Sequence, residues 1–319
     1  MTSPTSSLGR DIARFGSAIT LTVALGAVQV FVIPRRLDLA TYGEYRLFLV
    51  YVAYFGVLHL GLADGAFVRW AGRMPAEIHL EWRRAFWWML AMEGTLAVAA
   101  ALVWVGAPDS RAAMLVAAFT LCSLFANVST LASYALQAAG DFRRAGIVAV
   151  VATASFVTAM SLVPMHTITA VFGTYAGSLA LGALVGAVMV ARLPSAAGAR
   201  SGDPPMRLGA LLGTGMHVLG SNLAAGLAQS VDRILVSVVV PMTSMALYGF
   251  ASSVAVAGIS ATQTMSRVAL SHAARRSGDD RARFLGRFYD LTLAAYGVAL
   301  AGVPLFEHLV ARTLPAYVE

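Results

Sequence analysis

Nine apolar stretches of about twenty residues or more constrain the fold of this chain more than any other feature. The hydrocarbon core of a bilayer is about 30 Å thick, so a helix that crosses it needs about 20 mostly apolar residues. Because backbone polar groups must pair internally in lipid, these stretches favour helices, whereas a barrel would show ten-residue alternation. The sequence therefore predicts an all-α integral membrane protein, a polytopic helical transporter with about nine transmembrane helices. The stretches lie at residues 14–34, 45–65, 85–106, 112–137, 145–164, 168–191, 208–240, 246–266 and 286–306.

The composition excludes several other classes of protein. Charged residues make up 12% of the chain and hydrophobic residues 58%, whereas soluble domains are nearer 25% charged. Too few polar residues remain to cover a soluble surface, which excludes a soluble enzyme and a nucleic-acid-binding domain despite the net charge of +7. The HExxH, P-loop and GxSxG motifs are absent, as is a clustered Cys/His ligand set. We therefore expect no enzymatic activity, no cofactor and no metal site.

The distribution of arginines predicts the orientation. If the N-terminus is cytoplasmic, the cytoplasmic segments hold 17 arginines and the opposite segments hold five, as the positive-inside rule requires. The first stretch follows Arg10 and Arg14, like a signal peptide, but it ends at Pro34-Arg35-Arg36 without a small-residue cleavage site. We interpret it as an uncleaved first span. The expected location is a bacterial cytoplasmic membrane, crossed many times, with the N-terminus inside.

A polar stretch divides the chain into two unequal parts. Residues 193–207 read LPSAAGARSGDPPMR, and their small residues and three prolines are typical of a linker. The predicted domains are a six-helix N-terminal lobe at 1–192, a cytoplasmic linker at 193–207 and a partial C-terminal lobe of three helices at 208–319. Tyr42-Gly43 recurs as Tyr248-Gly249 near the start of the second part, which suggests a parallel internal repeat.

The seventh stretch carries the clearest polar stripe. Asn222, Gln229, Asp232 and Arg233 fall on one helical face. A charge at the bilayer centre costs at least about 2.5–3.5 kcal/mol, so such a stripe favours a cavity wall. The alternative is an ion pair within the helix, or at the outer interface, that only orients the helix.

Other polar residues lie in the first three spans. Glu93 is a candidate proton or cation site, but it could equally be protonated or paired with an arginine of a neighbouring helix. Asp64 and Arg69 bracket the end of the second span, either with a functional role or as an interfacial charge pair. Gln29 adds polar surface to the first span, as a central cavity would need, although one such residue more often makes an interhelical hydrogen bond worth about 0.6 kcal/mol.

Four segments resemble a known family. The stretch Ile33–Arg73 resembles the second-helix region of polysaccharide flippases, which share a superfamily with lipid II flippases and MATE-type multidrug exporters. Leu136–Arg144 is similar to the loop between their helices four and five, Gln229–Arg233 to a seventh-helix motif, and Ala246–Phe250 to the start of helix eight. The family has twelve or fourteen helices in two lobes. The resemblance therefore implies a truncated member, either a fragment or a chain that assembles with something else.

The resemblance implies that the chain translocates a polyprenyl-pyrophosphate-linked oligosaccharide across the cytoplasmic membrane for surface polysaccharide biosynthesis, by alternating access of two lobes. It implies as partners this lipid-linked glycan, membrane lipid and glycan polymerase or ligase proteins, with no nucleic acid. The implied site residues are Arg233 and Arg69 for contact with the head group, Asn222, Gln229 and Gln29 for the cavity wall, and Asp232, Asp64 and Glu93 for ion coupling or charge pairing.

Two other functions are compatible with the sequence. The first is a cation-coupled exporter of small amphipathic molecules, which needs an acidic residue deep in one lobe, as Glu93 would be. The second is a truncated, non-transporting membrane protein.

Overall fold

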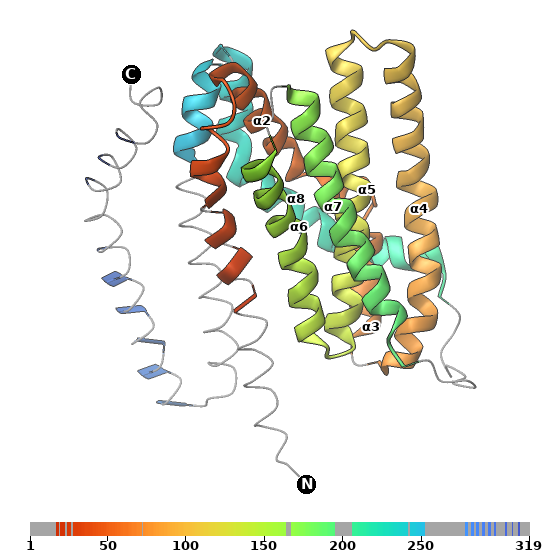
Figure 1. Ribbon diagram of the computed structural model, residues 1–319. Coiled ribbons are helices and arrows are strands. Elements are labelled where there is room, and N and C mark those ends of the chain that lie inside the picture. Colours follow the sequence, from red (N-terminus) through yellow and green to blue (C-terminus); the bar gives the residue numbers. More distant parts are fainter. Residues whose placement is uncertain are drawn as a thin grey trace.

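The computed structural model describes residues 17–252, except 19, 23, 27, 72, 164–166, 195–205 and 242, and scattered positions between 278 and 312. The regular elements in this part of the chain are all helical (Figure 1). A helix over 17–32 with three residues undescribed comes first, and a helix over 243–252 follows the last labelled one. The elements between them are α2 (Leu39–Val52), η1 (Phe55–Val57), α3 (Leu62–Trp70), α4 (Pro75–Gly106), α5 (Arg111–Ala138), α6 (Phe142–Leu162), α7 (Ile168–Ala191) and α8 (Leu208–Val239).

Four helices, α4 to α7, are long and apolar enough to cross a membrane. The bent pair formed by α2 with η1 and by α3 would make a fifth span. These helices confirm an all-α membrane protein. The helix α8 is not among the candidate spans. The count of nine spans and the orientation of the N-terminus stay predictions.

The helices α5, α6 and α7 begin and end within a few residues of the predicted stretches. Each begins after a side chain that caps a backbone N–H of its first turn, from Ser110, Asp141 and Thr167 respectively. The helix α4 begins at Pro75, well before the predicted start near residue 85. Proline suits the first helical position, and the Glu77 carboxylate accepts a hydrogen bond from the Met74 amide at 3.3 Å, so the charged first turns remain helical.

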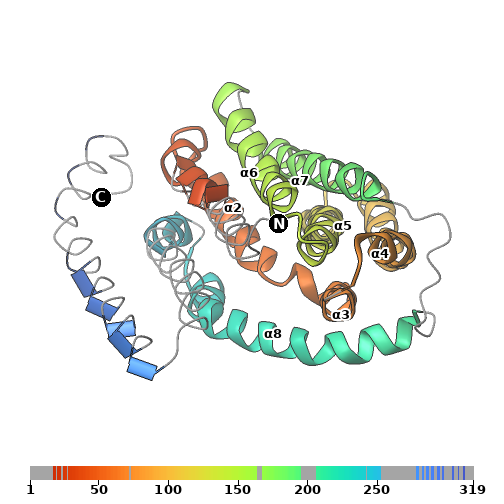
Figure 2. The same ribbon diagram turned by 90° about the horizontal axis from the view of Figure 1, so that it is seen from below.

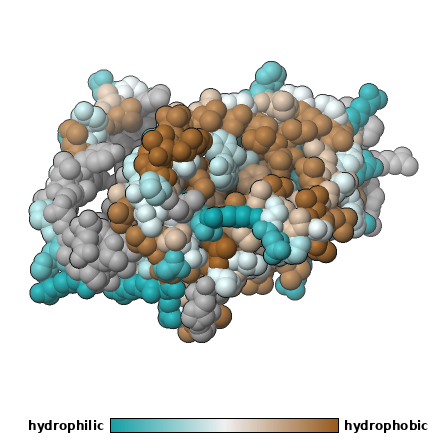
Figure 3. All heavy atoms as spheres, turned by 90° about the horizontal axis from the view of Figure 1, so that it is seen from above, coloured by the Kyte–Doolittle hydropathy of each residue, from teal (hydrophilic) through white to brown (hydrophobic). Residues whose placement is uncertain are grey.

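Large apolar side chains stay exposed on the outside of the helices. Trp87 on α4, Leu162 on α6 and Leu184 on α7 are each at least 60% exposed, and apolar atoms cover much of the face in Figure 3. Contiguous apolar patches of this kind are rare on soluble monomers. They are the surface that lipid would cover.

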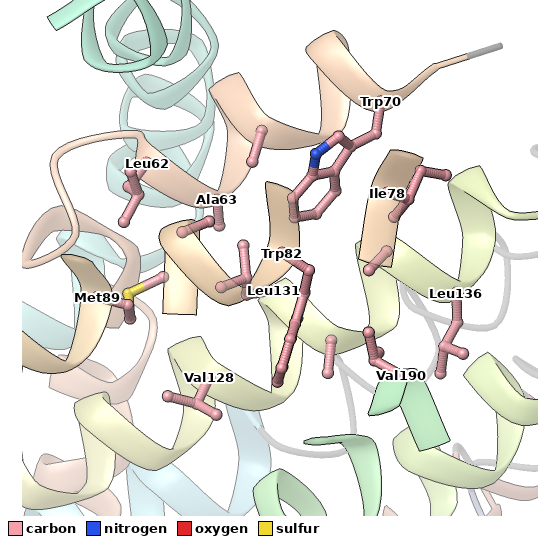
Figure 4. Packing of buried hydrophobic residues seen from close by; sticks show 14 of the residues in the cluster. Leu62, Ala63, Trp70, Ile78, Trp82, Met89, Val128, Leu131, Leu136 and Val190 are labelled. Atoms are coloured by element: carbon pink, nitrogen blue, oxygen red, sulfur yellow. The ribbon is translucent and has the colours of Figure 1, made fainter. Parts of the chain in front are cut away.

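The largest buried cluster joins α3, α4, α5 and α7. Trp70 at the end of α3 and Ile78 at the start of α4 lie near Trp82, with Leu131 of α5 and Val190 of α7 completing the group (Figure 4). Trp70, Ile78 and Leu131 are fully buried. The helix α5 contacts α3, α4, α6 and α7 and is therefore the central helix of this bundle.

The helix α8 runs obliquely across the bundle and passes over α3 (Figure 2). The two helices meet backbone to backbone. A Cβ atom placed on Gly215 would lie 1.8 Å from the carbonyl oxygen of Gly61, and one placed on Gly65 would lie 2.1 Å from that of Leu211. Real Cβ contacts are never so short, so glycine is required for this approach, as at other small-residue helix crossings.

The helix over 243–252 lies against the start of α2. Tyr42 and Tyr45 of α2 share a buried cluster with Ala246 and Phe250. A Cβ atom on Gly249 would lie 2.8 Å from the Cβ of Arg46. The two segments in which the Tyr-Gly pair recurs are thus neighbours in the fold.

Candidate functional site

The predicted stretch 45–65 is not one straight helix. The chain leaves α2 after Val52, passes through η1 and restarts as α3 at Leu62, with a bend of 53° between the two parts. Leu60 has φ +50° and Gly61 has φ +79°. Glycine adopts the left-handed region without strain, whereas leucine does so rarely. This pair of residues therefore ends the first helical part and redirects the chain into α3.

The break exposes a backbone carbonyl inside the bundle, and side chains of α5 bind it. The Phe55 carbonyl accepts hydrogen bonds from the Asn127 amide at 2.8 Å and the Ser123 hydroxyl at 3.2 Å. The Leu58 amide also donates to this carbonyl, at 3.1 Å, so three donors satisfy a carbonyl that would cost several kcal/mol if left unpaired in a membrane interior. Ser123 and Asn127 are four residues apart and lie on one face of α5.

Glu93 of α4 joins the same cluster. Its side chain is 0% exposed. One carboxyl oxygen lies 2.8 Å from the Asn127 amide nitrogen and the other lies 3.0 Å from the Ser123 hydroxyl. The predicted pairing with an arginine of a neighbouring helix does not occur among the described residues, where the hydrogen-bonding partners of Glu93 are neutral. Glu93, Ser123, Asn127 and the Phe55 carbonyl are called the Glu93 cluster below.

Arg69 lies at the end of α3 and pairs with Glu81 on α4. Its Nε lies 3.1 and 3.0 Å from the two carboxyl oxygens of Glu81, and its Nη2 lies 2.6 Å from one of them. Arg73 adds a contact from Nη1 at 3.1 Å. A two-pronged contact of this kind is the strong form of an arginine–carboxylate pair. Sequence reasoning paired Arg69 with Asp64 and missed Glu81.

Asp64 lies in the first turn of α3, and its side chain is largely buried beside the crossing with α8. No side chain in the described ranges hydrogen-bonds or ion-pairs with its carboxylate. The first turn of a helix favours a negative charge, which gives the carboxylate a structural reason for its place.

Asp232 and Arg233 lie near the end of α8. The Asp232 carboxylate accepts a hydrogen bond from the Tyr248 hydroxyl of the 243–252 helix, and Arg233 Nε lies 3.9 Å from it. The side chain of Asp232 is 52% exposed and that of Arg233 is 16% exposed. The two neighbours thus differ, since only the arginine is mostly covered by protein.

Gln29 lines a cavity of about 260 Å³ between the first helix, α2, α6 and α7. Its polar wall is made of hydroxyl and amide groups, and its apolar wall includes Leu49, Phe156 and Leu179. None of the residues that line it is charged. The polar lining residues are Thr22, Gln29, Tyr45, Thr153, Tyr175 and Ser178.

The remaining predicted residues lie on α8. Asn222 is exposed. Gln229 is within the helix, but its side chain lies outside the described atoms. The helix α8 also contacts the bent span next to η1. There the Tyr54 hydroxyl oxygen lies 2.5 Å from the Ser230 hydroxyl oxygen of α8.

A second cavity, of about 240 Å³, lies between α2 and α5. It is lined mainly by apolar side chains such as Phe48 and Phe119, with Glu44 and Arg111 on its wall. Arg111 Nη2 lies 2.5 Å from a Glu44 carboxyl oxygen. Sequence reasoning named neither residue, because both flank apolar stretches as ordinary interfacial charges do.

The structure therefore separates the predicted site residues into several places. Glu93 lies in a neutral buried cluster, Arg69 in a charge cluster, Gln29 at a polar cavity, and Asp232 with Arg233 at the end of α8. In the part of the chain that the structure describes, no group of three or more His, Cys, Asp or Glu side chains could hold a metal ion.

Comparisons of the chain with protein-family models, with curated proteins and with solved structures found no match.

Proposed function

We propose that the chain takes part in moving a polyprenyl-pyrophosphate-linked oligosaccharide across a bacterial cytoplasmic membrane, with its N-terminus inside. The proposal rests on the resemblance of its sequence segments to polysaccharide flippases. One structural observation supports it most directly, namely the cavity at Gln29 lined by uncharged hydroxyl and amide groups. Sugars are recognised by groups of this kind beside apolar and aromatic surfaces, because each sugar presents both hydroxyl edges and C–H faces.

The bent α2–α3 span and its contact with α8 support alternating access. Broken helices near the membrane midplane are common where transporters bind ions or substrate. The backbone contact at Gly61, Gly65 and Gly215 joins the bent span to the first helix of the predicted second lobe. A tilt of α8 would therefore act on the break.

Arginines would bind the pyrophosphate. A guanidinium contacts phosphate oxygens with paired hydrogen bonds, as Arg69 already contacts Glu81. In this proposal Arg69 exchanges Glu81 for phosphate during transport, and Arg233 provides a second contact. Asp232 and Asp64 would hold these charges in the states without substrate.

The test is mass spectrometry of polyprenyl-linked glycans in cells with and without the gene. We expect a lipid-linked oligosaccharide to accumulate on deletion and to disappear when the 319-residue chain is supplied. Arg233→Ala should fail to complement while remaining in the membrane, and Arg192→Ala, an exposed arginine at the end of α7, is the matched control. An unchanged glycan pool on deletion would contradict the proposal.

A cation-coupled exporter of small amphipathic molecules is the second candidate. The observation that favours it is Glu93, an acidic group buried deep among α4, α5 and the break. Sensitivity of the deletion strain to amphipathic drugs, with no change in lipid-linked glycans, would favour this candidate over the first.

A further inference from the structure

We infer that the Glu93 cluster is a proton-binding site and that its protonated form holds the break of the α2–α3 span. Only the role of this proton in driving transport rests on the proposed function. The assignment of the proton itself rests on the hydrogen bonds of the cluster and on the burial of its carboxyl group.

A count of hydrogens supports a proton on Glu93. The Asn127 amide offers two hydrogens but has three acceptors in reach, the Phe55 carbonyl and one Glu93 oxygen, both at 2.8 Å, and the Ser123 hydroxyl oxygen at 3.1 Å. The Ser123 hydroxyl offers one hydrogen but has two acceptors in reach, the Phe55 carbonyl at 3.2 Å and the second Glu93 oxygen at 3.0 Å. With an ionised Glu93, three hydrogens therefore serve five contacts, and two contacts lack a hydrogen.

A proton on the second Glu93 oxygen supplies one of the two missing hydrogens, so that only the Asn127–Ser123 contact lacks its own. Glu93 then donates to Ser123, and Ser123 donates to the Phe55 carbonyl. Asn127 donates to both the Phe55 carbonyl and the first Glu93 oxygen. The result is a closed ring of four hydrogen bonds in which every hydrogen has one acceptor and the net charge is zero.

The surroundings disfavour the ionised form. Glu93 is 0% exposed, and no arginine or histidine in the described ranges lies within ion-pair distance of it. A buried carboxylate without a cation loses its hydration and gains only two neutral donors. Buried ionisable groups on the elements that form the cluster include Cys122 of α5, His59 between η1 and α3, and Asp64 of α3, and none of the three is hydrogen-bonded to Glu93.

Release of the proton would change the hydrogen bonds that the Phe55 carbonyl accepts at the break. The O–H bond of Glu93 breaks, the proton leaves to water, and the Ser123 hydroxyl turns from the Phe55 carbonyl to the new carboxylate. The Phe55 carbonyl then keeps the Leu58 and Asn127 donors and loses the Ser123 donor. Because α3 follows the break and meets α8 backbone to backbone, a change at the break reaches α8 directly.

The experiment compares the full chain with its Glu93→Gln variant in lipid nanodiscs, by infrared spectroscopy and amide hydrogen exchange over a pH series. At neutral pH we expect a carboxylic-acid C=O band in the wild type that is absent from Glu93→Gln and that disappears as the pH rises. Exchange of the Leu58 amide, which donates to the Phe55 carbonyl within the break, should quicken about five- to tenfold when the band disappears, the equivalent of one hydrogen bond. In Glu93→Gln it should not change with this titration.

Two controls keep the assignment testable. Glu77→Gln changes a carboxylate in the first turn of the same helix, retains a capping side chain, and should leave the band in place. Ser123→Ala removes the hydrogen bond from Ser123 to the Phe55 carbonyl. In this variant the Leu58 amide should therefore exchange faster than in the wild type already at neutral pH. This comparison tests the site even if Glu93→Gln fails to fold.

The proposal is overturned if the wild type and Glu93→Gln have the same carboxylic-acid bands at neutral pH, or if exchange at the break does not follow the titration. None of these measurements needs a substrate. An unchanged glycan pool on gene deletion together with a titrating Glu93 band would thus contradict the flippase function alone. An accumulating glycan without such a band would contradict the proton site alone.

Discussion

Two buried glutamates of α4 have different partners for their carboxyl groups. Glu81 and Glu93 are twelve residues apart, about 18 Å along the helix axis. Glu81 lies near the start of the helix and faces the guanidinium groups of Arg69 and Arg73. Glu93 lies deeper and hydrogen-bonds only with the neutral side chains of Asn127 and Ser123.

The difference follows from access to water. Near the helix start, the arginines remain partly exposed, with Arg69 at 21%, so a charged cluster keeps part of its hydration. At Glu93 that hydration is absent, and an arginine would have to be buried as well. The comparison indicates that one position is built for charge and the other for a proton.

The largest effect should come from removing the deeper carboxyl group. Glu93→Ala removes one acceptor of the Asn127 amide and the hydrogen bond to Ser123 and opens a void, so we expect a loss of about 2–4 kcal/mol in the free energy of unfolding. Glu93→Gln keeps the shape and should cost less than about 1 kcal/mol. Unfolding in mixed micelles measures both. Equal losses for the two variants would show that Glu93 is needed as a charge.

Removing the outer carboxylate should have a smaller and salt-dependent effect. Glu81→Ala leaves two guanidinium groups of the α3–α4 turn without this carboxylate, and we expect a loss of about 1–2 kcal/mol at low ionic strength. Added salt should shrink the loss, because partly exposed charges are screened. The loss for Glu93→Ala should not change with salt. A salt-independent loss for Glu81→Ala would remove the distinction between the two sites.

Loss of one neutral donor sharpens the comparison further. Ser123→Ala should cost about 1 kcal/mol, the usual net value of one hydrogen bond. Ser129→Ala on the same helix, where no described hydrogen bond of the Ser129 side chain is lost, is the matched control and should cost less. A larger cost at Ser129 than at Ser123 would contradict the importance of the Glu93 cluster.

The smallest effect is expected at a third carboxylate, outside the spans. Asp38 precedes α2, and the hydroxyl and amide of Thr41 donate to it, which lowers the pKa of Asp38 below its usual value. Its contribution is therefore present above the unfolded pKa and lost as the pH falls through the lower folded pKa. Asp38→Ala should cost about 0.5–1 kcal/mol at pH 7.

The control for Asp38 is the pH itself. The difference in unfolding free energy between the wild type and Asp38→Ala should vanish in acid, below the lowered pKa. A difference that persists there would assign the effect to packing and not to the charge of the cap.

Sequence reasoning could predict the long apolar helices and the polar residues that lie within apolar stretches. The bounds of α5 to α7 follow from long apolar runs that begin at capping side chains. The break at Leu60 and Gly61 could not be predicted, because the sequence is apolar on both sides of it and the carbonyl partner comes from α5. The ion-pair partner of Arg69 could not be predicted for a similar reason. Asp64 is closer to Arg69 in sequence, but the turn into α4 brings Glu81 to it.

The Glu93 cluster shows the same limit. Glu93 stood out as a charge within an apolar stretch, and Asn127 as one of several intramembrane amides. Their contact depends on how α4 packs against α5, because the two residues are thirty-four positions apart in the chain. Hydrophobic periodicity specifies helices, but it carries little information about which faces of two long apolar helices meet.

The backbone contact between α3 and α8 restricts how this chain can be recombined. The predicted linker at 193–207 looks like a natural point for exchanging halves between related proteins. The contact crosses that point, because Gly61 and Gly65 lie before it and Gly215 lies after it. A chimera joined at the linker would keep this close contact between α3 and α8 only if one parent supplies glycine at positions 61 and 65 and the other supplies glycine at position 215. The bent span and α8 are therefore one unit of exchange, although more than a hundred residues separate them.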